Sequence, residues 1–224
     1  MNDGINRNDG VIKIIPEPTL RRLPLYYQYL NKTAQNDVNG FISCTQIAND
    51  LGFVPVQVRK DIEMTGAVGR PKVGYNVGEL AKAIEHFLGW NNTSDAFLIG
   101  AGHLGLALLG YPGFKDYGVN IVAAFDTDPN KVGKEIRGRK IFHIKKLPEM
   151  TKRLNIRLGI LTVPGAYVQE IADMMVQAGI RGIWNFAPVK VTVKENVIVQ
   201  HENLASSLAV LSKRLATALE AKKE

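Results

Sequence analysis

The sequence predicts an α/β protein with an N-terminal winged-helix domain and a C-terminal Rossmann domain built on a parallel sheet. Three observations carry this prediction. Two short helical segments flank a glycine-containing turn and precede a basic loop rich in Gly and Pro. The second half alternates short apolar runs with helical patterns, which is typical of a parallel sheet. A glycine-rich loop directly follows the first of those runs.

The bulk composition is that of a globular protein. A length of 224 residues fits one large domain or two modest ones, and 46% apolar with 22% charged residues is ordinary for such a chain. No apolar run reaches the roughly 18–20 residues needed to cross a bilayer, and the polar N-terminus lacks the order of a secretory signal. We therefore expect a cytoplasmic protein without a membrane partner.

The net charge of +7 fits an anionic partner, but it is unevenly distributed. Residues 1–90 hold 10 Lys and Arg against 9 Asp and Glu, whereas residues 91–224 hold 18 against 12. The basic excess lies mostly outside the winged-helix segment, so a case for DNA depends on local arrangement. The single cysteine, Cys44, excludes an intrachain disulfide. We interpret it as a small packed residue rather than as a reactive thiol.

The N-terminal domain is expected over residues 15–90. Residues 1–14, rich in Asn, Asp and Gly, predict a disordered arm before it. Thr19 can cap a helix that runs to about Asn31. Pro24 removes a backbone donor, so the pattern predicts either a kink there or a helix that starts at this residue.

A helix-turn-helix pattern follows in this domain. Ser43 or Thr45 caps a second helix, which Gly52 ends. A third helix is predicted from Pro55 to about Met64. Because Gly and Pro prevent a long regular element over the next ten residues, that segment predicts a small loop or hairpin with basic side chains, like the wing of a winged helix. A further helix is expected over residues 78–89.

Polar, turn-rich residues 90–94 mark the boundary to a Rossmann domain over residues 91–202. Short apolar runs bounded by turn residues indicate buried parallel strands. The strands are expected over residues 96–99, 121–125, 158–163 and 182–186, with a helix near 166–178.

Residues 203–224 form a separate C-terminal element. Asn203 is a candidate N-cap for a helix to about Ala221. An apolar stripe along this helix needs something to pack against. Its members, at spacings of three and four, are Leu204, Leu208, Leu211, Leu215 and Leu219.

The G-x-G-x-x-G spacing of dinucleotide-binding loops occurs at Gly100-Ala101-Gly102-His103-Leu104-Gly105, between a predicted strand and a predicted helix. Gly100 permits a sharp turn, Gly102 lets a pyrophosphate approach the backbone, and Gly105 allows close helix packing. Free N–H groups at the helix N-terminus then attract the phosphates. A glycine-rich turn without a ligand is the alternative.

Asp126 ends the second predicted strand, about 21 residues after this loop. An acid there accepts hydrogen bonds from ribose hydroxyls and repels a 2′-phosphate, which favours NAD(H). Basic residues further on, Arg137, Arg139 and Lys140, leave an NADP(H) site open. Ligands of open α/β sheets bind beyond the carboxyl ends of strands. Two strand ends therefore supply the other cofactor candidates, with ordinary loop packing as the alternative: Thr162, Val163, Pro164, Asn185 and Phe186.

The pattern favours binding without catalysis. No catalytic residue and no metal-ligand cluster stands out, and the helix after residue 203 is too little for a substrate domain. Two alternatives stay open. One is a small NAD-dependent oxidoreductase with a helical accessory domain, and the other is an NAD-binding adaptor whose N-terminal helices bind a protein.

From about Ile15 to Leu219 the chain resembles the bacterial redox-sensing repressors of the Rex family. The glycine loop alone is common, but the ordered set is specific. Besides that loop, the matching segments are Ile15-Pro16-Glu17-Pro18-Thr19, Arg22-Leu23-Pro24-Leu25-Tyr26, Val58-Arg59-Lys60-Asp61, Val73-Gly74-Tyr75, Tyr111-Pro112-Gly113-Phe114, Phe125-Asp126-Thr127-Asp128-Pro129, Leu161-Thr162-Val163-Pro164 and Asn185-Phe186-Ala187-Pro188.

The resemblance implies a homodimer whose last helix is exchanged between subunits, with palindromic double-stranded operator DNA as partner. It implies that NADH binding releases the DNA, that NAD is compatible with it, and that the target genes serve fermentation and anaerobic respiration. Asn203 departs from the pattern, since family members often carry Asp there. This departure bears on the preference for NADH over NAD.

For DNA, Gln57, Arg59 and Lys60 are expected on the groove-facing surface of the third helix. Arg59 suits guanine and Gln57 suits adenine, while wing residues are expected at phosphates or in the minor groove. Solvated surface charges are the alternative. The predicted contacts outside this helix are Thr45, Arg70, Lys72 and Tyr75.

Overall fold

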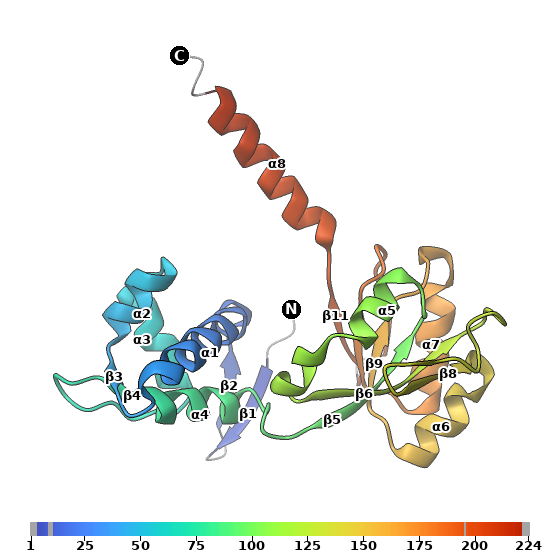
Figure 1. The fold of residues 1–224 in the computed structure, drawn as a ribbon, viewed down its shortest axis with the longest axis horizontal. Coiled ribbons are helices and arrows are strands. Elements are labelled where there is room, and N and C mark those ends of the chain that lie inside the picture. The colour runs from blue at the N-terminus through green and yellow to red at the C-terminus, as the bar shows by residue number, and fades with distance from the viewer. Residues whose placement is uncertain (1–3, 9–10, 195, 221–224) are drawn as a thin grey trace. The chain divides into compact units, whose positions relative to one another are not determined.

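The computed structural model describes residues 4–8, 11–194 and 196–220. The chain divides into two compact units, Met1–Asn92 and Thr93–Glu224, each with its own buried hydrophobic cluster (Figure 1). No helix among the described residues is long and apolar enough to cross a membrane.

An antiparallel hairpin opens the first unit. Strand β1 (Gly4–Asn8) pairs with β2 (Val11–Ile15), with Gly4 opposite Ile15. A disordered arm is predicted over residues 1–14, and the structure differs from that prediction at both strands. The reason lies in β2, where four of the five residues are Val or Ile. Such side chains favour extended backbone.

Helix α1 (Glu17–Asp37) is longer than the predicted helix and carries Pro24 in its interior. Its apolar face packs into the unit's core, where Leu23, Tyr26 and Leu30 are fully buried. This burial holds the helix together across a missing backbone hydrogen bond. The predicted capping role of Thr19 is wrong, because α1 begins before it and its hydroxyl donates to Asp61 at 2.8 Å.

The predicted helix-turn-helix is present. Ser43 caps α2 (Cys44–Leu51) by accepting the Gln46 N–H at 3.1 Å, and Gly52 ends it with a φ of +72°. Pro55 begins α3 (Pro55–Met64). The remaining elements are β3 (Phe41–Ile42), its antiparallel partner β4 (Tyr75–Asn76), and α4 (Val77–Phe87).

The second unit is built on a sheet with the strand order β11-β10-β9-β5-β6-β8-β7. Every described pair is parallel except β7 with β8. The strands are β5 (Ser94–Ile99), β6 (Val119–Asp126), β7 (Glu135–Ile136), β8 (Arg139–His143), β9 (Leu158–Leu161), β10 (Gly182–Asn185) and β11 (Ile198–His201).

The chain order reverses between β5 and β9, so the carboxyl ends of these strands form the switch point where ligands bind in such sheets. Strands β7, β8 and β11 were not predicted, because they are short and mix polar or charged residues with apolar ones. The helices are α5 (His103–Leu109), α6 (Leu147–Leu154), α7 (Val168–Ala178) and α8 (Leu204–Glu220), with short 3-10 turns at Pro112–Tyr117, Ile144–Lys146 and Gly165–Tyr167.

The last helix, α8, begins after a cap as predicted, since the Asn203 side chain accepts the Ser206 N–H at 3.2 Å. Its described leucine side chains are exposed, with Leu208 and Leu211 each at 62%. The stripe therefore has no cover from the described residues of this chain.

Candidate nucleic-acid interface and nucleotide pocket

Helix α3 has one buried and one open face. Val58 and Ile62 are fully buried, as their spacing implies. Arg59 and Lys60 are exposed, and Gln57 is half-buried. The helix thus presents polar and basic side chains outward, which is what a recognition helix requires.

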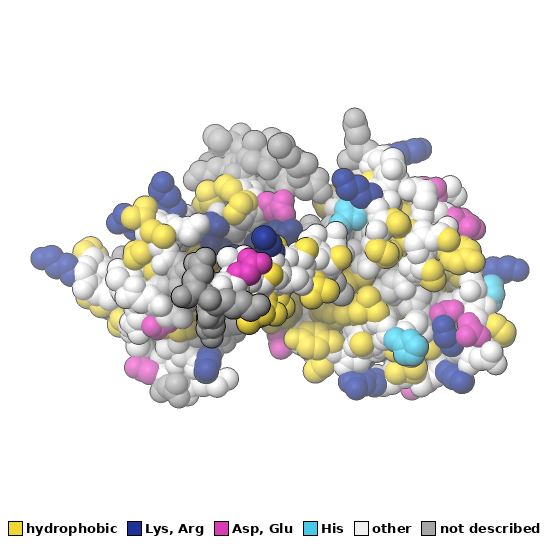
Figure 2. All heavy atoms as spheres, turned by 90° about the horizontal axis from the view of Figure 1, so that it is seen from above, with side chains coloured by type: hydrophobic (Ala, Val, Ile, Leu, Met, Phe, Trp, Pro, Cys, Tyr) yellow, Lys and Arg dark blue, Asp and Glu magenta, His cyan; other side chains and the backbone are white. Residues whose placement is uncertain are grey.

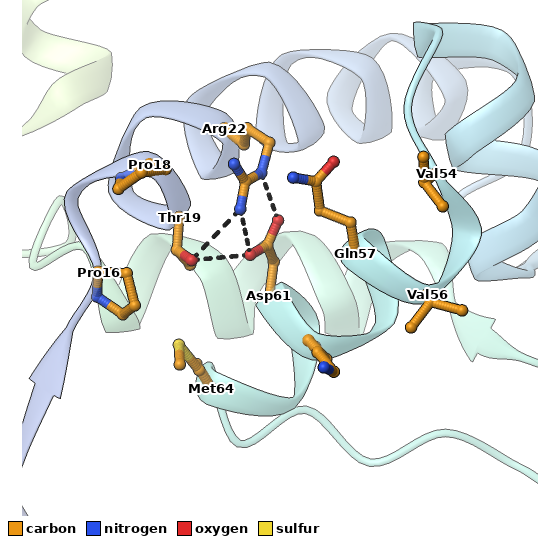
Figure 3. Close-up of a pocket in the computed structure, with 10 residues that line it drawn as sticks. Pro16, Pro18, Thr19, Arg22, Val54, Val56, Gln57, Asp61 and Met64 are labelled. Atoms are coloured by element: carbon orange, nitrogen blue, oxygen red, sulfur yellow. Dashed lines mark hydrogen bonds and ion pairs between the residues drawn. The ribbon is translucent and has the colours of Figure 1, made fainter.

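A buried polar cluster joins α3 to α1 (Figure 3). Asp61, only 2% exposed, accepts hydrogen bonds from Thr19, Arg22 and Tyr26 at 2.7–2.9 Å. Burial by itself would raise the pKa of Asp61, but these hydrogen bonds, with the charge of Arg22, lower it below its usual value. Burial raises the pKa of Tyr26, with the neighbouring carboxylate adding to the effect. The cluster therefore holds an ionised Asp61 beneath the open face.

A cavity of about 440 Å³ lies between the start of α1 and α3 (Figure 3). Its rim is apolar, and its polar side chains belong to the cluster or to α3. The lining residues are Pro16, Pro18, Thr19, Arg22, Val54, Val56, Gln57, Lys60, Asp61 and Met64.

Cys44 is half-buried at the start of α2. Burial raises the pKa of its thiol, although the nearby charge of Arg59 acts in the opposite direction. The thiol is accordingly protonated at neutral pH, which favours a packing role over a reactive one.

A tight loop between α3 and β4 forms the wing. The Arg70 N–H donates to the Gly74 carbonyl at 2.7 Å, and Gly74 has a φ of +104°. A Cβ there would lie 2.4 Å from the Ile42 carbonyl, so the close approach requires glycine. The Arg70 guanidinium sits 4.8 Å from the centre of the Phe41 ring. Lys and Arg side chains mark this end of the unit in dark blue at the left of Figure 2.

The remaining predicted DNA contacts lie in the same unit. Thr45 is exposed on α2, and Lys72 is exposed at the wing with a φ of +62°. Tyr75 follows the wing in β4 and is half-buried, which raises the pKa of its hydroxyl.

The fold of the second unit itself requires glycine at two positions of the glycine loop. Gly100 has a φ of +100°, and its carbonyl accepts the Thr162 hydroxyl at 2.7 Å. A Cβ on Gly105 would lie 2.0 Å from the Gly100 carbonyl. These two glycines therefore serve the sharp turn and the close packing of α5 against it, as predicted.

Gly102 behaves differently. It has a φ of −78°, which any residue adopts, and a Cβ there would meet nothing within 4 Å. Neither strain nor packing within the described chain explains this glycine. The open space lies at the N-terminus of α5, where unpaired N–H groups attract anions.

Asp126, at the end of β6, lies beside this loop. Its carboxylate accepts the Ala101 and Asp128 N–H groups at 2.8 and 2.9 Å, and Lys131 approaches it at 3.1 Å. Burial would raise the pKa of Asp126, but these partners outweigh that effect and lower it. An ionised acid with a lysine neighbour thus lies beside the glycine loop.

A cavity of about 880 Å³ opens over the switch point, which is ample for a dinucleotide. The structure brings together nine of the twelve predicted cofactor residues in its lining: Gly100, Gly102, His103, Leu104, Asp126, Thr162, Val163, Pro164 and Phe186. It does not place Ala101, Gly105 or Asn185 there.

The predicted direct role of Asn185 in the pocket is not supported by this placement. Its side chain is fully buried and bonded to Ala187, Val189 and His201. Sequence reasoning missed Lys131 and Tyr167, which line the cavity. Lys131 follows Asp126 by five residues in the β6 loop, a spacing that offered a signal.

The basic residues that kept NADP(H) binding as an alternative lie outside the cavity. Arg137 donates to the Gly110 carbonyl and Arg139 to the Ile121 carbonyl. Neither these two nor Lys140 lines the cavity. Within the part of the chain that the structure describes, no group of three metal-ligating side chains occurs.

A winged-helix unit joined to a Rossmann unit with an open nucleotide pocket defines a class, the DNA-binding regulators that carry a dinucleotide-binding domain. A family model described as "putative DNA-binding protein N-terminus" matches residues 14–62, and one described as "CoA binding domain" matches residues 91–189. Curated relatives include the redox-sensing transcriptional repressors Rex of Treponema denticola and Bacteroides thetaiotaomicron. The Treponema protein is 49% identical over 92% of this chain and 97% of its own length. The Bacteroides protein is 42% identical over 90% of this chain and 91% of its own length.

Solved structures agree over 94% of this chain. A Rex-family repressor, RSP, in complex with NAD+ and operator DNA matches with a TM-score of 0.86 at 35% identity, covering 94% of this chain and 97% of that one. Its complex with NADH matches with a TM-score of 0.84 at 34% identity, covering 94% and 99%. The chain belongs to the Rex family of redox-sensing transcriptional repressors. It is therefore a regulator and not the small oxidoreductase that the Rossmann pattern had left open.

Proposed function

We propose that this repressor reads the NADH/NAD balance by binding either nucleotide in the Rossmann cavity, and that NADH releases it from operator DNA. The observation that carries the proposal is the empty space over Gly102. The protein's own packing accounts for Gly100 and Gly105 but leaves this third glycine for a ligand. A pyrophosphate at that position would meet the N-terminus of α5.

The other lining residues support one orientation of the dinucleotide in the cavity. The adenosine ribose lies at Asp126, with Lys131 as a second hydrogen-bonding group. The nicotinamide lies toward Thr162–Pro164, Tyr167 and Phe186, which line the cavity at the other strand ends. An ionised Asp126 disfavours a 2′-phosphate, so NAD(H) binds in preference to NADP(H).

On the DNA side, α3 enters the major groove. Arg59 contacts guanine and Gln57 adenine, with Lys60 beside them. Thr45, Arg70, Lys72 and Tyr75 contact the backbone or the minor groove. The exposure of Arg59, Lys60 and the wing supports this assignment.

The functional unit is a homodimer, and the exposed leucine stripe of α8 supplies the surface that the partner covers. A dimer places two recognition helices roughly 34–36 Å apart, which suits a palindrome. NADH changes DNA affinity only through its different affinities for the DNA-competent and the released arrangement. Operator DNA must weaken NADH binding by the same factor.

The experiment is fluorescence anisotropy on a labelled palindromic promoter fragment without nucleotide, with NAD and with NADH, at fixed salt because phosphate contacts are salt-dependent. Tight binding that NADH abolishes and NAD preserves is the expected result. Specific binding with the same DNA affinity in the absence of nucleotide, with NAD and with NADH would contradict the proposed redox switch. A protein that binds no palindromic fragment of a wide promoter set contradicts the operator assignment.

A further inference from the structure

The cofactor cavity and the last helix are connected through two neighbouring strand ends. Strands β10 and β11 are parallel, with Asn185 opposite His201. Beyond Asn185 the chain forms the cavity-lining residues 186–188. Beyond His201 it runs directly into α8 (Figure 1). We call His201–Asn203 the α8 root.

Asn185 holds both segments with one side chain. Its Oδ1 accepts the Ala187 N–H at 3.0 Å, and its Nδ2 donates to the Val189 carbonyl at 2.8 Å. The same Nδ2 lies 3.0 Å from His201 Nδ1. Asn185 is fully buried, so exchanging one of these partners for water is costly. A shift of the cavity-lining segment therefore acts on the α8 root.

Trp184 makes a second connection. Its indole Nε1 donates to Glu202 Oε1 at 3.0 Å. The same ring packs against Phe186, with ring centres 4.7 Å apart, and Phe186 lines the cavity. The backbone adds a third tie, because the Glu202 N–H donates to the Asn185 carbonyl at 2.9 Å.

We propose that Asn185 and Trp184 are positioning residues that transmit the occupancy of the nicotinamide end of the cavity to the α8 root, and so to the orientation of α8. This inference rests on the proposed function and specifies how its two sites communicate. The ties are short, partly buried and confined to the two strand ends. A packed network of this kind has few alternative arrangements, so a ligand that favours one of them moves α8 as a unit.

The test removes the two side-chain ties at the α8 root, keeps the backbone bond, and leaves every cavity-lining residue intact. The double variant H201A/E202A lacks both side-chain partners. The matched control is Q169A, which loses side-chain bonds between α7 and Thr192 in the same unit. For each protein, NADH affinity is measured by NADH fluorescence, and DNA affinity by anisotropy with and without NADH.

We expect the double variant to keep NADH affinity and nucleotide-free DNA affinity within about twofold of the wild type. The factor by which NADH weakens DNA binding should fall about fivefold or more, whereas Q169A should keep the wild-type factor. If H201A/E202A loses NADH binding, W184F decides the matter, because it retains an aromatic ring and removes the indole donor. A reduced factor in W184F supports the inference, and an unchanged factor overturns it.

Two outcomes separate this inference from the proposed function. If NADH weakens DNA binding by the same factor in the wild type and in H201A/E202A, the inference alone is overturned. A wild-type protein whose DNA affinity ignores NADH overturns the proposed function and the inference together.

Discussion

Arg22 of α1 and Asp61 of α3 form a two-point ion pair, with Nε to Oδ2 at 2.7 Å and Nη2 to Oδ1 at 2.8 Å. The side chain of Asp61 is 3% exposed and that of Arg22 17%. This pair fixes the proposed recognition helix to the first helix of its unit. Gln57 lies four residues before Asp61 in α3, and Lys60 lies one residue before it. The pair therefore also determines the position of the groove-facing side chains.

Replacing Arg22 by Leu should destabilise the N-terminal unit by about 3 kcal/mol, because it leaves a buried carboxylate without its cation. Urea unfolding measures this. The control is R21L, which breaks the exposed pair of Arg21 with Glu17 and should cost about 0.5 kcal/mol or less. Equal losses in the two variants would contradict the role of the Arg22–Asp61 pair.

The lowered pKa of Asp61 predicts a pH dependence of stability. A carboxyl whose pKa is lower in the folded state stabilises the fold above its unfolded pKa of about 4, and this stabilisation is lost as pH falls through the folded pKa. The difference in unfolding free energy between the wild type and D61N should therefore narrow below about pH 4. A difference that stays constant from pH 6 to pH 3 would show that ionisation of Asp61 contributes nothing.

Substitution of Arg59 by Ala should weaken operator binding by about 1–3 kcal/mol and relax the base preference at one position of each half-site. Anisotropy on a panel of single-base operator variants measures both effects. K82A, which removes an exposed charge on α4, is the control and should change affinity little. A uniform loss of affinity across all operator sequences would instead assign Arg59 to a phosphate.

The glycine loop offers a pair of matched substitutions. G102A should leave thermal stability nearly unchanged, because its Cβ meets open space, and should weaken NADH binding by occupying the ligand's volume. G105A should destabilise the second unit, because its Cβ would lie 2.0 Å from the Gly100 carbonyl. Thermal melts with and without NADH separate the two effects. Wild-type NADH affinity in G102A would count against a pyrophosphate at this position.

The leucine stripe of α8 predicts the oligomeric state. L211E/L215E should yield monomers and lose at least about tenfold in affinity for a palindrome, since one recognition helix then binds without the other. Analytical ultracentrifugation and anisotropy report the two quantities. K213E introduces a negative charge on the same helix outside the stripe and should remain dimeric. A dimeric L211E/L215E would place the dimer contact elsewhere.

Much of the fold was predictable because the relevant signals are local. Gly52 and Pro55 each act on backbone groups within a few residues, so the end of α2 and the start of α3 followed from the sequence, and of the two predicted caps Ser43 and Thr45 the structure has Ser43. The prediction of a disordered arm over residues 1–14 differs from the structure at Gly4–Asn8 and Val11–Ile15, while residues 1–3 and 9–10 lie outside the described residues. The Asn and Gly content of this segment suggested disorder, whereas the Val and Ile residues of β2 favoured an extended strand.

In the cofactor site, sequence spacing identified which loops meet at the switch point but not the direction of each side chain. Thr162 lines the cavity, yet its hydroxyl is bonded to the Gly100 carbonyl. Asn185 ends strand β10 as expected, yet its side chain is directed to His201 and does not line the cavity. Lys131 reaches the pocket because the loop after β6 folds back on Asp126.

The sequence by itself determined the helix-turn-helix, the end of α2 at Gly52, the start of α3 at Pro55, the glycine loop and the acid at the end of β6, because each depends on neighbours along the chain. Only the tertiary structure decided that Thr19 and Arg22 meet Asp61 and that Trp184 and Asn185 meet the α8 root. Such pairs are 16 to 42 residues apart. Backbone preferences act over a few residues, so contacts at that range arise from the packing of whole helices and strands, which no local pattern encodes.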